Sequence, residues 1–114
     1  MPISKSAIKR GDIVVVPFPY SDQLAEKRRP ALVVSGNKFN DRGFLWVVMI
    51  TSKVEGSPPD VVQFDHNKAG LSKPSVVRVA KLATIEASRV LRVAGHMDSK
   101  AFNAVGKVIN SILS

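Results

Sequence analysis

The chain contains no cysteine, which is the first constraint on what it can be. Without thiols the protein forms no disulfide and no thiolate metal site. Long hydrophobic runs are missing too, because no apolar stretch approaches the length of a membrane-spanning helix. The first ten residues, MPISKSAIKR, lack the apolar core of a signal peptide. We therefore expect a cytoplasmic protein that does not enter a membrane.

Acidic residues are scarce relative to basic ones. Nine Asp and Glu stand against seventeen Lys and Arg, which gives a formal net charge of +8. A domain this basic commonly binds a polyanion, either nucleic acid or an acidic protein segment. The cations are spread along the chain, which favours a charged face of a folded domain over a disordered basic tail.

Metal-binding and phosphate-cradle motifs are also absent. His66 and His96 are the only histidines and have no ligand spacing to Asp or Glu, so we expect both to be surface histidines. No GxxxxGK[ST] sequence occurs, and no nucleophile motif supports a Ser-His-Asp arrangement. We therefore expect neither a metal nor a cofactor.

Short β-branched runs, by contrast, are abundant and predict a mainly β fold. The run Phe44–Ile50 is almost unbroken in apolar residues and predicts a central strand buried on both faces. We expect strands over residues 12–17, 30–35, 44–50, 61–65, 75–85 and 89–94, the last two paired as a hairpin around 86–88.

The last segment is the clearest helix. Asp98 stands at the N-cap position, with Met97 and Phe102 placed as a hydrophobic staple around it. One apolar stripe follows at helical spacing: Ala101, Phe102, Val105, Val108, Ile109 and Ile112. No repeat or linker divides the 114 residues. We expect one domain, 1–114, built as a small antiparallel β-barrel closed by the C-terminal helix.

A polar, highly charged segment separates the first two predicted strands and ends in Arg29-Pro30. Proline has no N–H for a central ladder, so we expect the second strand to begin no earlier than Pro30. Arg29 is then held extended at the mouth of that strand, where its guanidinium is suited to bind a phosphate. The alternative is that Lys27–Arg29 is only a solvated basic loop.

The next polar loop, GNKFNDRG over residues 36–43, places Phe39 between Lys38 and Arg42. This pattern suits single-stranded nucleic acid, because a base stacks on the ring while the cations hold phosphates. An exposed turn whose phenylalanine folds back onto the core explains the same pattern. The sequence leaves both interpretations open.

Thr51 follows the most buried predicted strand, and strand ends in a small barrel meet on one rim. RNA cleavage needs no protein nucleophile, because the ribose 2′-OH attacks the neighbouring phosphate. A guanidinium and a hydroxyl can orient that phosphate and stabilise its added negative charge. Arg29 and Thr51, with Ser52 and Lys53 beside Thr51, are candidates for such a site, whereas a strand-terminal threonine taken alone is most often structural.

Several of these segments together resemble the PemK/MazF family of toxin–antitoxin ribonucleases. GDIVVVPF, a polar loop and RRPALVVS, within residues 11–35, resemble the family's opening. The similarity also covers the end of the third strand, a Gly-Leu…Ser-Val segment, a basic strand and the approach to the closing helix. The matching residues here are 50–52, 70–71 with 75–77, 81–85 and 94–97.

This resemblance implies an SH3-like barrel with a helix, assembled as a homodimer. It implies a growth-inhibiting toxin that cleaves single-stranded mRNA without metal, leaves a cyclic phosphate and is neutralised by an acidic antitoxin. The family's catalytic pair is the arginine of Arg-Pro and the threonine after the third strand, which correspond to Arg29 and Thr51. Further RNA contacts are expected from Asp22, Gln23, Glu26, Lys27, Arg28, Lys38, Phe39, Arg42, Ser52 and Lys53.

The first loop departs from the family pattern. Many members carry Gly-Ser-Glu-Gln early in this loop, whereas this chain reads SDQL over 21–24 and has Glu26 nearer to Arg29. Either Asp22 or Glu26 takes the place of the acidic partner. Arginine stays protonated at ordinary pH, so Arg29 is a charge stabiliser and the general base is unassigned.

Two other functions fit a basic domain of this kind. A related toxin branch poisons gyrase by binding it and relies on a tryptophan near the chain end, whereas the single tryptophan here, Trp46, lies in a predicted buried strand. A non-catalytic SH3-like nucleic-acid-binding module needs only positive charge, and the presence of Arg29 and Thr51 counts against it. The sequence favours a toxin ribonuclease.

Overall fold

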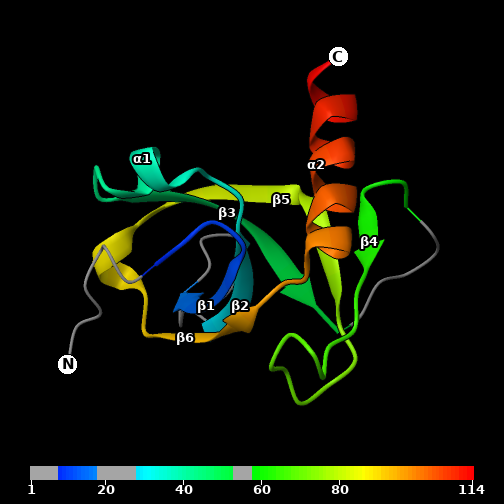
Figure 1. Ribbon diagram of the computed structural model, residues 1–114, viewed down its shortest axis with the longest axis horizontal. Helices are drawn as coiled ribbons and strands as arrows, with labels where there is room; N and C mark the ends of the chain where they lie inside the picture. Colours follow the sequence, from blue (N-terminus) through cyan, green and yellow to red (C-terminus); the bar gives the residue numbers. More distant parts are fainter. Residues whose placement is uncertain (1–7, 18–27, 53–57) are drawn as a thin grey trace.

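The computed structural model describes residues 8–17, 28–52 and 58–114. Within these ranges one antiparallel sheet has the strand order β4-β5-β3-β2-β1-β6, and α2 stands against β4 and β5 (Figure 1). The strands are β1 (Asp12–Pro17), β2 (Arg28–Val33), β3 (Phe44–Thr51), β4 (Val61–Gln63), β5 (Val76–Glu86) and β6 (Arg92–His96). The helices are α1 (Asn37–Asn40), the 3-10 turn η2 (Ala87–Arg89) and α2 (Ser99–Leu113).

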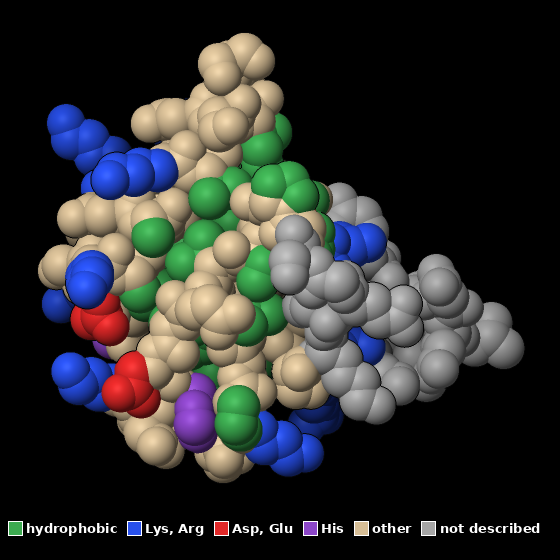
Figure 2. Space-filling view, turned by 90° about the vertical axis from the view of Figure 1, so that its right-hand side faces the viewer, with side chains coloured by type: hydrophobic (Ala, Val, Ile, Leu, Met, Phe, Trp, Pro, Cys, Tyr) green, Lys and Arg blue, Asp and Glu red, His purple; other side chains and the backbone are tan. Residues whose placement is uncertain are grey.

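Each face of the sheet carries its own apolar cluster, because successive strand residues point to opposite faces. The face covered by α2, called here the helix face, includes Ile13, Leu32, Val48, Ile50, Val62 and Val77. The opposite face includes Val14, Val16, Ala31, Val33, Leu45 and Val47. On the side that carries α2 and β4, Lys and Arg side chains surround a central apolar area (Figure 2).

Helix α2 begins as the sequence predicts. The Asp98 carboxylate accepts a hydrogen bond from the Ala101 N–H at 2.9 Å, which confirms the N-cap. Met97 is buried, and Phe102 packs on the same cluster of the helix face. Ile112 remains more than half exposed, so the apolar stripe of the helix extends beyond the cover that its own sheet provides.

The sheet is open rather than closed. In the described ranges β4 and β6 are its two edges, so an antiparallel sheet with a C-terminal helix is established and a closed barrel is not. The predicted hairpin of β5 with β6 is wrong, because β6 pairs with β1. The segment between them is bound at two places: the Ala87 N–H donates to the carbonyl of Gly43, just before β3, and the Leu91 N–H donates to the carbonyl of Val15 in β1. The chain thereby passes from β5 to the far edge of the sheet.

Strand β2 begins at Arg28, so the prediction that it starts no earlier than Pro30 is wrong. The Val33 carbonyl accepts from Gly11 N–H on the β1 side, and alternation therefore turns the Pro30 nitrogen toward β3. The ladder between β2 and β3 ends at Ala31. Pro30 thus lies beyond the last pair on that side, where its missing N–H costs no hydrogen bond.

Strand β3 is central, as predicted, because β2 and β5 flank it. The prediction that it is buried on both faces is wrong for its first residues, because Phe44 and Trp46 are 44% and 48% exposed. Both residues belong to the helix face by alternation, at the end of the strand that α2 does not cover.

An irregularity in β5 sets how the edge strand β4 is placed. Val48 pairs with Leu82 but the next residue, Met49, pairs with Arg78, so the ladder with β3 skips residues 79–81. Asp60 binds this bulge. Its carboxylate accepts from Arg78 Nε at 3.0 Å and from the Ala80 N–H at 3.1 Å, and its carbonyl accepts from the Val79 N–H at 3.0 Å.

These contacts lower the pKa of the Asp60 carboxyl group. Burial by itself raises the pKa of this carboxyl, but the hydrogen bonds from Arg78 and Ala80, together with the positive charge of Arg78, outweigh it. The net result is a pKa below the ordinary value of 3.8. The carboxylate therefore favours the folded state at neutral pH.

Replacing this carboxylate should destabilise the protein in a pH-dependent way. We expect Asp60→Asn to lower the free energy of unfolding by about 1–3 kcal/mol at pH 7, because a charged acceptor of two hydrogen bonds is lost from the bulge of β5. Since the folded pKa of Asp60 is depressed, its contribution is complete above the ordinary value and is lost as the pH falls through the folded pKa. Urea unfolding between pH 7 and pH 3 measures both effects.

The wild type and Asp60→Asn should therefore converge in stability in acid. Asp41→Asn, an exposed carboxylate after α1, is the matched control and should change the free energy of unfolding little at any pH. A gap between wild type and Asp60→Asn that stays constant down to pH 3 would contradict this account.

Candidate functional site

The register of β2 against β3 brings Arg29 and Thr51 together. The ladder between these strands ends with Ala31 opposite Met49, and continuing it by two residues puts Arg29 opposite Thr51. Steps of two residues keep side chains on one face, so both belong to the face opposite α2. Arg29 is also paired with Val16 of β1, which fixes its backbone. Both residues line one cavity of about 340 Å³ at these strand ends.

The described residues around this cavity are cationic and hydroxylic. Four cations line it: Arg28, Arg29, Lys73 and Arg92. Four hydroxyl side chains join them: Thr51, Ser52, Ser72 and Ser75. No carboxylate stands among the described lining residues, so the field of the cavity favours anions.

The two neighbouring arginines differ in placement. Arg28 precedes Arg29 in the same strand and so projects to the opposite side of the sheet. Val15 stands opposite both Pro30 and Arg92, which puts Arg28 and Arg92 on one face. Arg29 therefore shares its face with Thr51, whereas Arg28 shares its face with Arg92.

The sequence did not single out Lys73, Ser72, Ser75 or Arg92 as site residues. Arg92 did carry a signal, because it interrupts the apolar alternation of β6, and a charge inside a short strand often marks a functional edge. The other three belong to the loop between β4 and β5, whose path depends on the tertiary fold.

The predicted loop residues Lys38, Phe39 and Arg42 lie elsewhere. They belong to α1 and the turn before β3, at the end of that strand opposite to Thr51. Eight strand residues span roughly 24 Å, so the structure does not bring this loop to the cavity. Phe39 is half-buried and packs edge-to-face on Trp46, with ring centroids 5.8 Å apart. The remaining predicted residues, Asp22, Gln23, Glu26, Lys27 and Lys53, lie outside the described residues.

An apolar groove of about 680 Å³ lies between α1 and the last turns of α2. Figure 1 shows α1 and α2 on the same side of the sheet. The groove runs between the last turns of α2 and the helix face of the sheet. Its lining includes Phe39, Trp46, Leu82, Ile109, Ile112 and Leu113.

A separate polar pair ties β1 to β6. His96 Nδ1 lies 2.9 Å from Asp12 Oδ1, while the other carboxylate oxygen accepts from the Lys9 N–H at 2.8 Å. Gly11 has φ +92°, and a Cβ there would meet the His96 ring at 2.9 Å. Gly11 and Asp12 therefore have a structural role in joining β1 to β6. Among the described residues no three His, Asp or Glu side chains are grouped so as to hold a metal ion.

Comparison with known proteins identifies the family. The family model described as PemK-like, MazF-like toxin of type II toxin–antitoxin systems matches residues 9–113. The chain therefore belongs to the PemK/MazF toxin family, as its motifs predicted. A comparison with curated protein sequences finds no match.

Solved structures share the fold. An endoribonuclease from a mycobacterial species, in complex with its cognate antitoxin, has a TM-score of 0.77 and 18% identity and covers 93% of this chain and 94% of its own. The MazE–MazF complex of Deinococcus radiodurans (Form-III) has a TM-score of 0.75 at 24% identity, with 93% and 95% covered. The Mycobacterium tuberculosis toxin MazF-mt6 has a TM-score of 0.74 at 22% identity, with 90% and 95% covered.

No helix in the described part of the chain is long and apolar enough to cross a membrane.

The charge of the cavity predicts where a polyanion binds. We expect Arg92→Ala to lower the salt dependence of binding to a short single-stranded oligonucleotide, reducing the slope of log K against log salt by about 0.7. Arg42→Ala removes the same charge at the opposite end of β3 and should leave the slope unchanged. Fluorescence anisotropy at several salt concentrations measures this slope. Equal losses in the two variants would show that general charge, and not the cavity, governs binding.

Proposed function

We propose that this protein is a toxin endoribonuclease that cleaves single-stranded mRNA in the cytoplasm without a metal ion. One observation carries the proposal: Arg29 and Thr51 line the same cavity with three further cations, and the register of β2 against β3, continued by two residues, puts them opposite each other. In a toxin of this family, the cations of the cavity would bind an RNA phosphate, and the Arg29 guanidinium and Thr51 hydroxyl would already be placed to donate hydrogen bonds to it. We also infer that this six-stranded sheet with its C-terminal helix is a form of the SH3-like barrel.

The proposed reaction uses the substrate's own nucleophile. The ribose 2′-oxygen bonds to the adjacent phosphorus and the bond from phosphorus to the 5′-oxygen breaks. The products are a 2′,3′-cyclic phosphate and a free 5′-hydroxyl. Negative charge accumulates on the phosphate oxygens between these events, and the Arg29 guanidinium and Thr51 hydroxyl stabilise it.

Two protons move in this reaction. One leaves the 2′-hydroxyl and one reaches the departing 5′-oxygen. Arginine is a poor proton acceptor, so Arg29 is given only the role of charge stabiliser. The described residues of the cavity include no carboxylate or imidazole. Asp22 or Glu26 of the first loop takes the place of the family's acidic residue in this proposal.

The catalytic proposal predicts different outcomes for two adjacent arginines. Arg29→Ala should lower the cleavage rate by about 10²–10³-fold, because a donor placed in advance at the developing charge is lost. Binding to RNA should weaken only modestly, since many phosphate contacts share it. Single-turnover cleavage of a long RNA in EDTA, with binding measured in parallel, separates the two effects.

Arg28→Ala is the matched control, because it removes the same charge from the same cavity but from the other face of the strand. Its cleavage rate should fall far less than that of Arg29→Ala, because Arg28 does not share the face of Thr51. Thr51→Ala should fall between the two variants, since a hydroxyl contributes one neutral hydrogen bond. Equal losses for Arg28→Ala and Arg29→Ala would remove the catalytic role of Arg29 and leave only generic charge.

We further propose that the apolar groove is the homodimer surface. Contiguous exposed apolar area of this kind marks protein–protein contacts. Trp46 is half exposed there, and Leu113 at the end of α2 is 78% exposed. A second copy related by a two-fold axis would present the same groove to the first, so each protomer would cover its partner's exposed side chains.

Leu113→Glu should weaken self-association without unfolding the protomer, because this side chain makes few contacts within its own chain. We expect the variant to sediment as a monomer at concentrations where the wild type is a dimer. Asn110→Glu adds the same charge to an exposed position of α2 outside the groove and should remain dimeric. A wild type that is monomeric at micromolar concentration would exclude the dimer.

An acidic antitoxin completes the proposal. A domain with a net charge of +8 attracts an acidic segment, and the cationic cavity is where such a segment would compete with RNA. We propose that this partner combines Asp and Glu with apolar anchors and folds as it binds. Its affinity would then fall as salt is added.

A further inference from the structure

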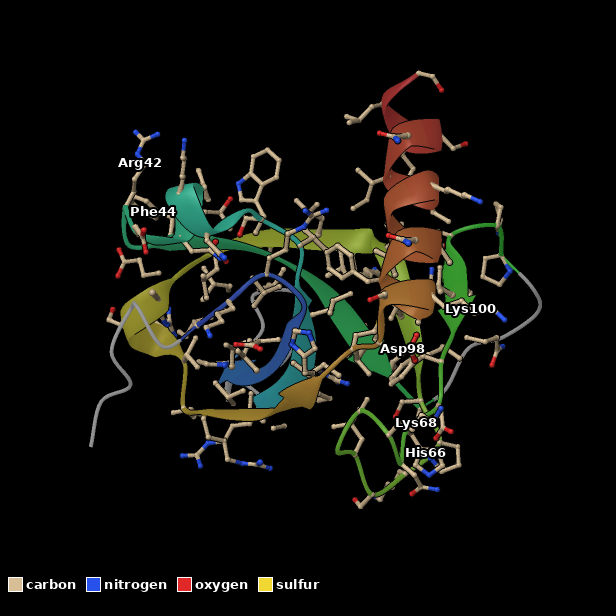
Figure 3. All side chains as sticks on the ribbon, viewed as in Figure 1. Arg42, Phe44, His66, Lys68, Asp98 and Lys100 are labelled. Atoms are coloured by element: carbon tan, nitrogen blue, oxygen red, sulfur yellow. The ribbon has the colours of Figure 1, made fainter. Side chains whose placement is uncertain are left out.

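A second, smaller hollow adjoins the cavity at Arg29 and Thr51. It has a volume of about 170 Å³ and shares Ser52 and Ser75 with that cavity. The rest of its described lining comes from the end of β4, the loop after it and the start of β5: Gln63, Phe64, His66, Pro74 and Val76. The loop that carries His66 lies at the end of the molecule away from Arg42 and Phe44 (Figure 3). We call this hollow the side hollow.

Strand register aligns the side hollow with the site. Val76 of β5 stands opposite Thr51 of β3 on one side and opposite Gln63 of β4 on the other. Directly opposed residues project from the same face, so Gln63 shares the face of Thr51 and Arg29. Two strand spacings separate Gln63 from Thr51, or roughly 10 Å. A ligand bound at Arg29 and Thr51 reaches Gln63 by extending along this row.

The chemistry of the two hollows differs. Four cations line the main cavity, whereas none stands among the described residues of the side hollow. The side hollow offers instead the exposed amide of Gln63, which both donates and accepts, and the half-buried imidazole of His66. A cationic cavity suits phosphate. A hollow without Lys or Arg, with an amide and a flat ring, suits a base, which is bound by its polar edge and by stacking.

We propose that the side hollow is the binding subsite for the base of a nucleotide next to the scissile phosphate, and that Gln63 determines which base is preferred there. The proposal rests on the proposed ribonuclease function. Gln63 contacts the polar edge of the base through its amide, and the His66 ring packs on the face of the base. Ser52 and Ser75 lie where the two hollows meet, beside the sugar that joins base and phosphate.

The test is cleavage of a random single-stranded RNA pool, with the cleaved ends sequenced to give base frequencies around the cut. The wild type should prefer particular bases at one position next to the scissile phosphate. Gln63→Ala should reduce that preference roughly tenfold, the scale of one well-placed side-chain contact to a base edge. His66→Ala should lower the cleavage rate at all sequences and keep the order of preference.

Lys68→Ala is the control, because Lys68 is exposed on the same loop but does not line either hollow. It should keep both the rate and the preference. Circular dichroism melting of Gln63→Ala checks that this edge-strand variant is folded. A wild type that cleaves RNA with no preference beside the cut would overturn the subsite, as would a preference that Gln63→Ala leaves intact. Failure of the wild type to cleave any RNA would instead overturn the proposed function on which the subsite rests.

Discussion

The register of β3 against its two neighbours is the constraint on which the site depends. Ala31 stands opposite Met49 on one side of β3, and Val76 stands opposite Thr51 on the other. A slip by one residue between β2 and β3 would turn the side chains of β2 to the other face and separate Arg29 from Thr51, and a slip between β5 and β3 would likewise displace Val76 from Thr51. Both faces of β3 carry apolar clusters, so such a slip would also expose core residues. The same strand register is therefore required both to bury the core and to assemble the site.

Asp60 fixes the strand register at the edge of the sheet, where β4 pairs with β5. The bulge at residues 79–81 shifts β5 against β3, and these residues have no pairing partner in β3, so the backbone N–H groups of Val79 and Ala80 need another acceptor. Asp60 supplies that acceptor from the residue just before β4. The carboxylate thereby holds both β5 and β4 in the register that aligns Gln63 with Thr51. This contact at the edge of the sheet thus fixes the position of Gln63 beside the cavity.

Local sequence predicted the parts that short-range physics decides. The cap at Asp98, the central strand predicted over Phe44–Ile50 and the family motifs at Arg29 and Thr51 could all be read from residue pattern. The strand partners could not, because β6 leaves β5 to pair with β1 through contacts that no local pattern encodes. Arg92 and Lys73 reach the cavity only through that pairing and through the β4–β5 loop. Trp46 was misjudged because an apolar run does not reveal where the helix that covers it ends.

The central claim is that the ribose 2′-OH of the substrate performs the chemistry while the protein supplies placed positive charge. The most direct test is an RNA oligonucleotide with one cleavable position whose single 2′-OH is replaced by hydrogen, incubated with the wild-type protein in EDTA. The account predicts that the unmodified oligonucleotide is cut to a 2′,3′-cyclic phosphate. It predicts that the modified one is bound with similar affinity and is not cut. Cleavage of the 2′-deoxy oligonucleotide at that position would contradict the account.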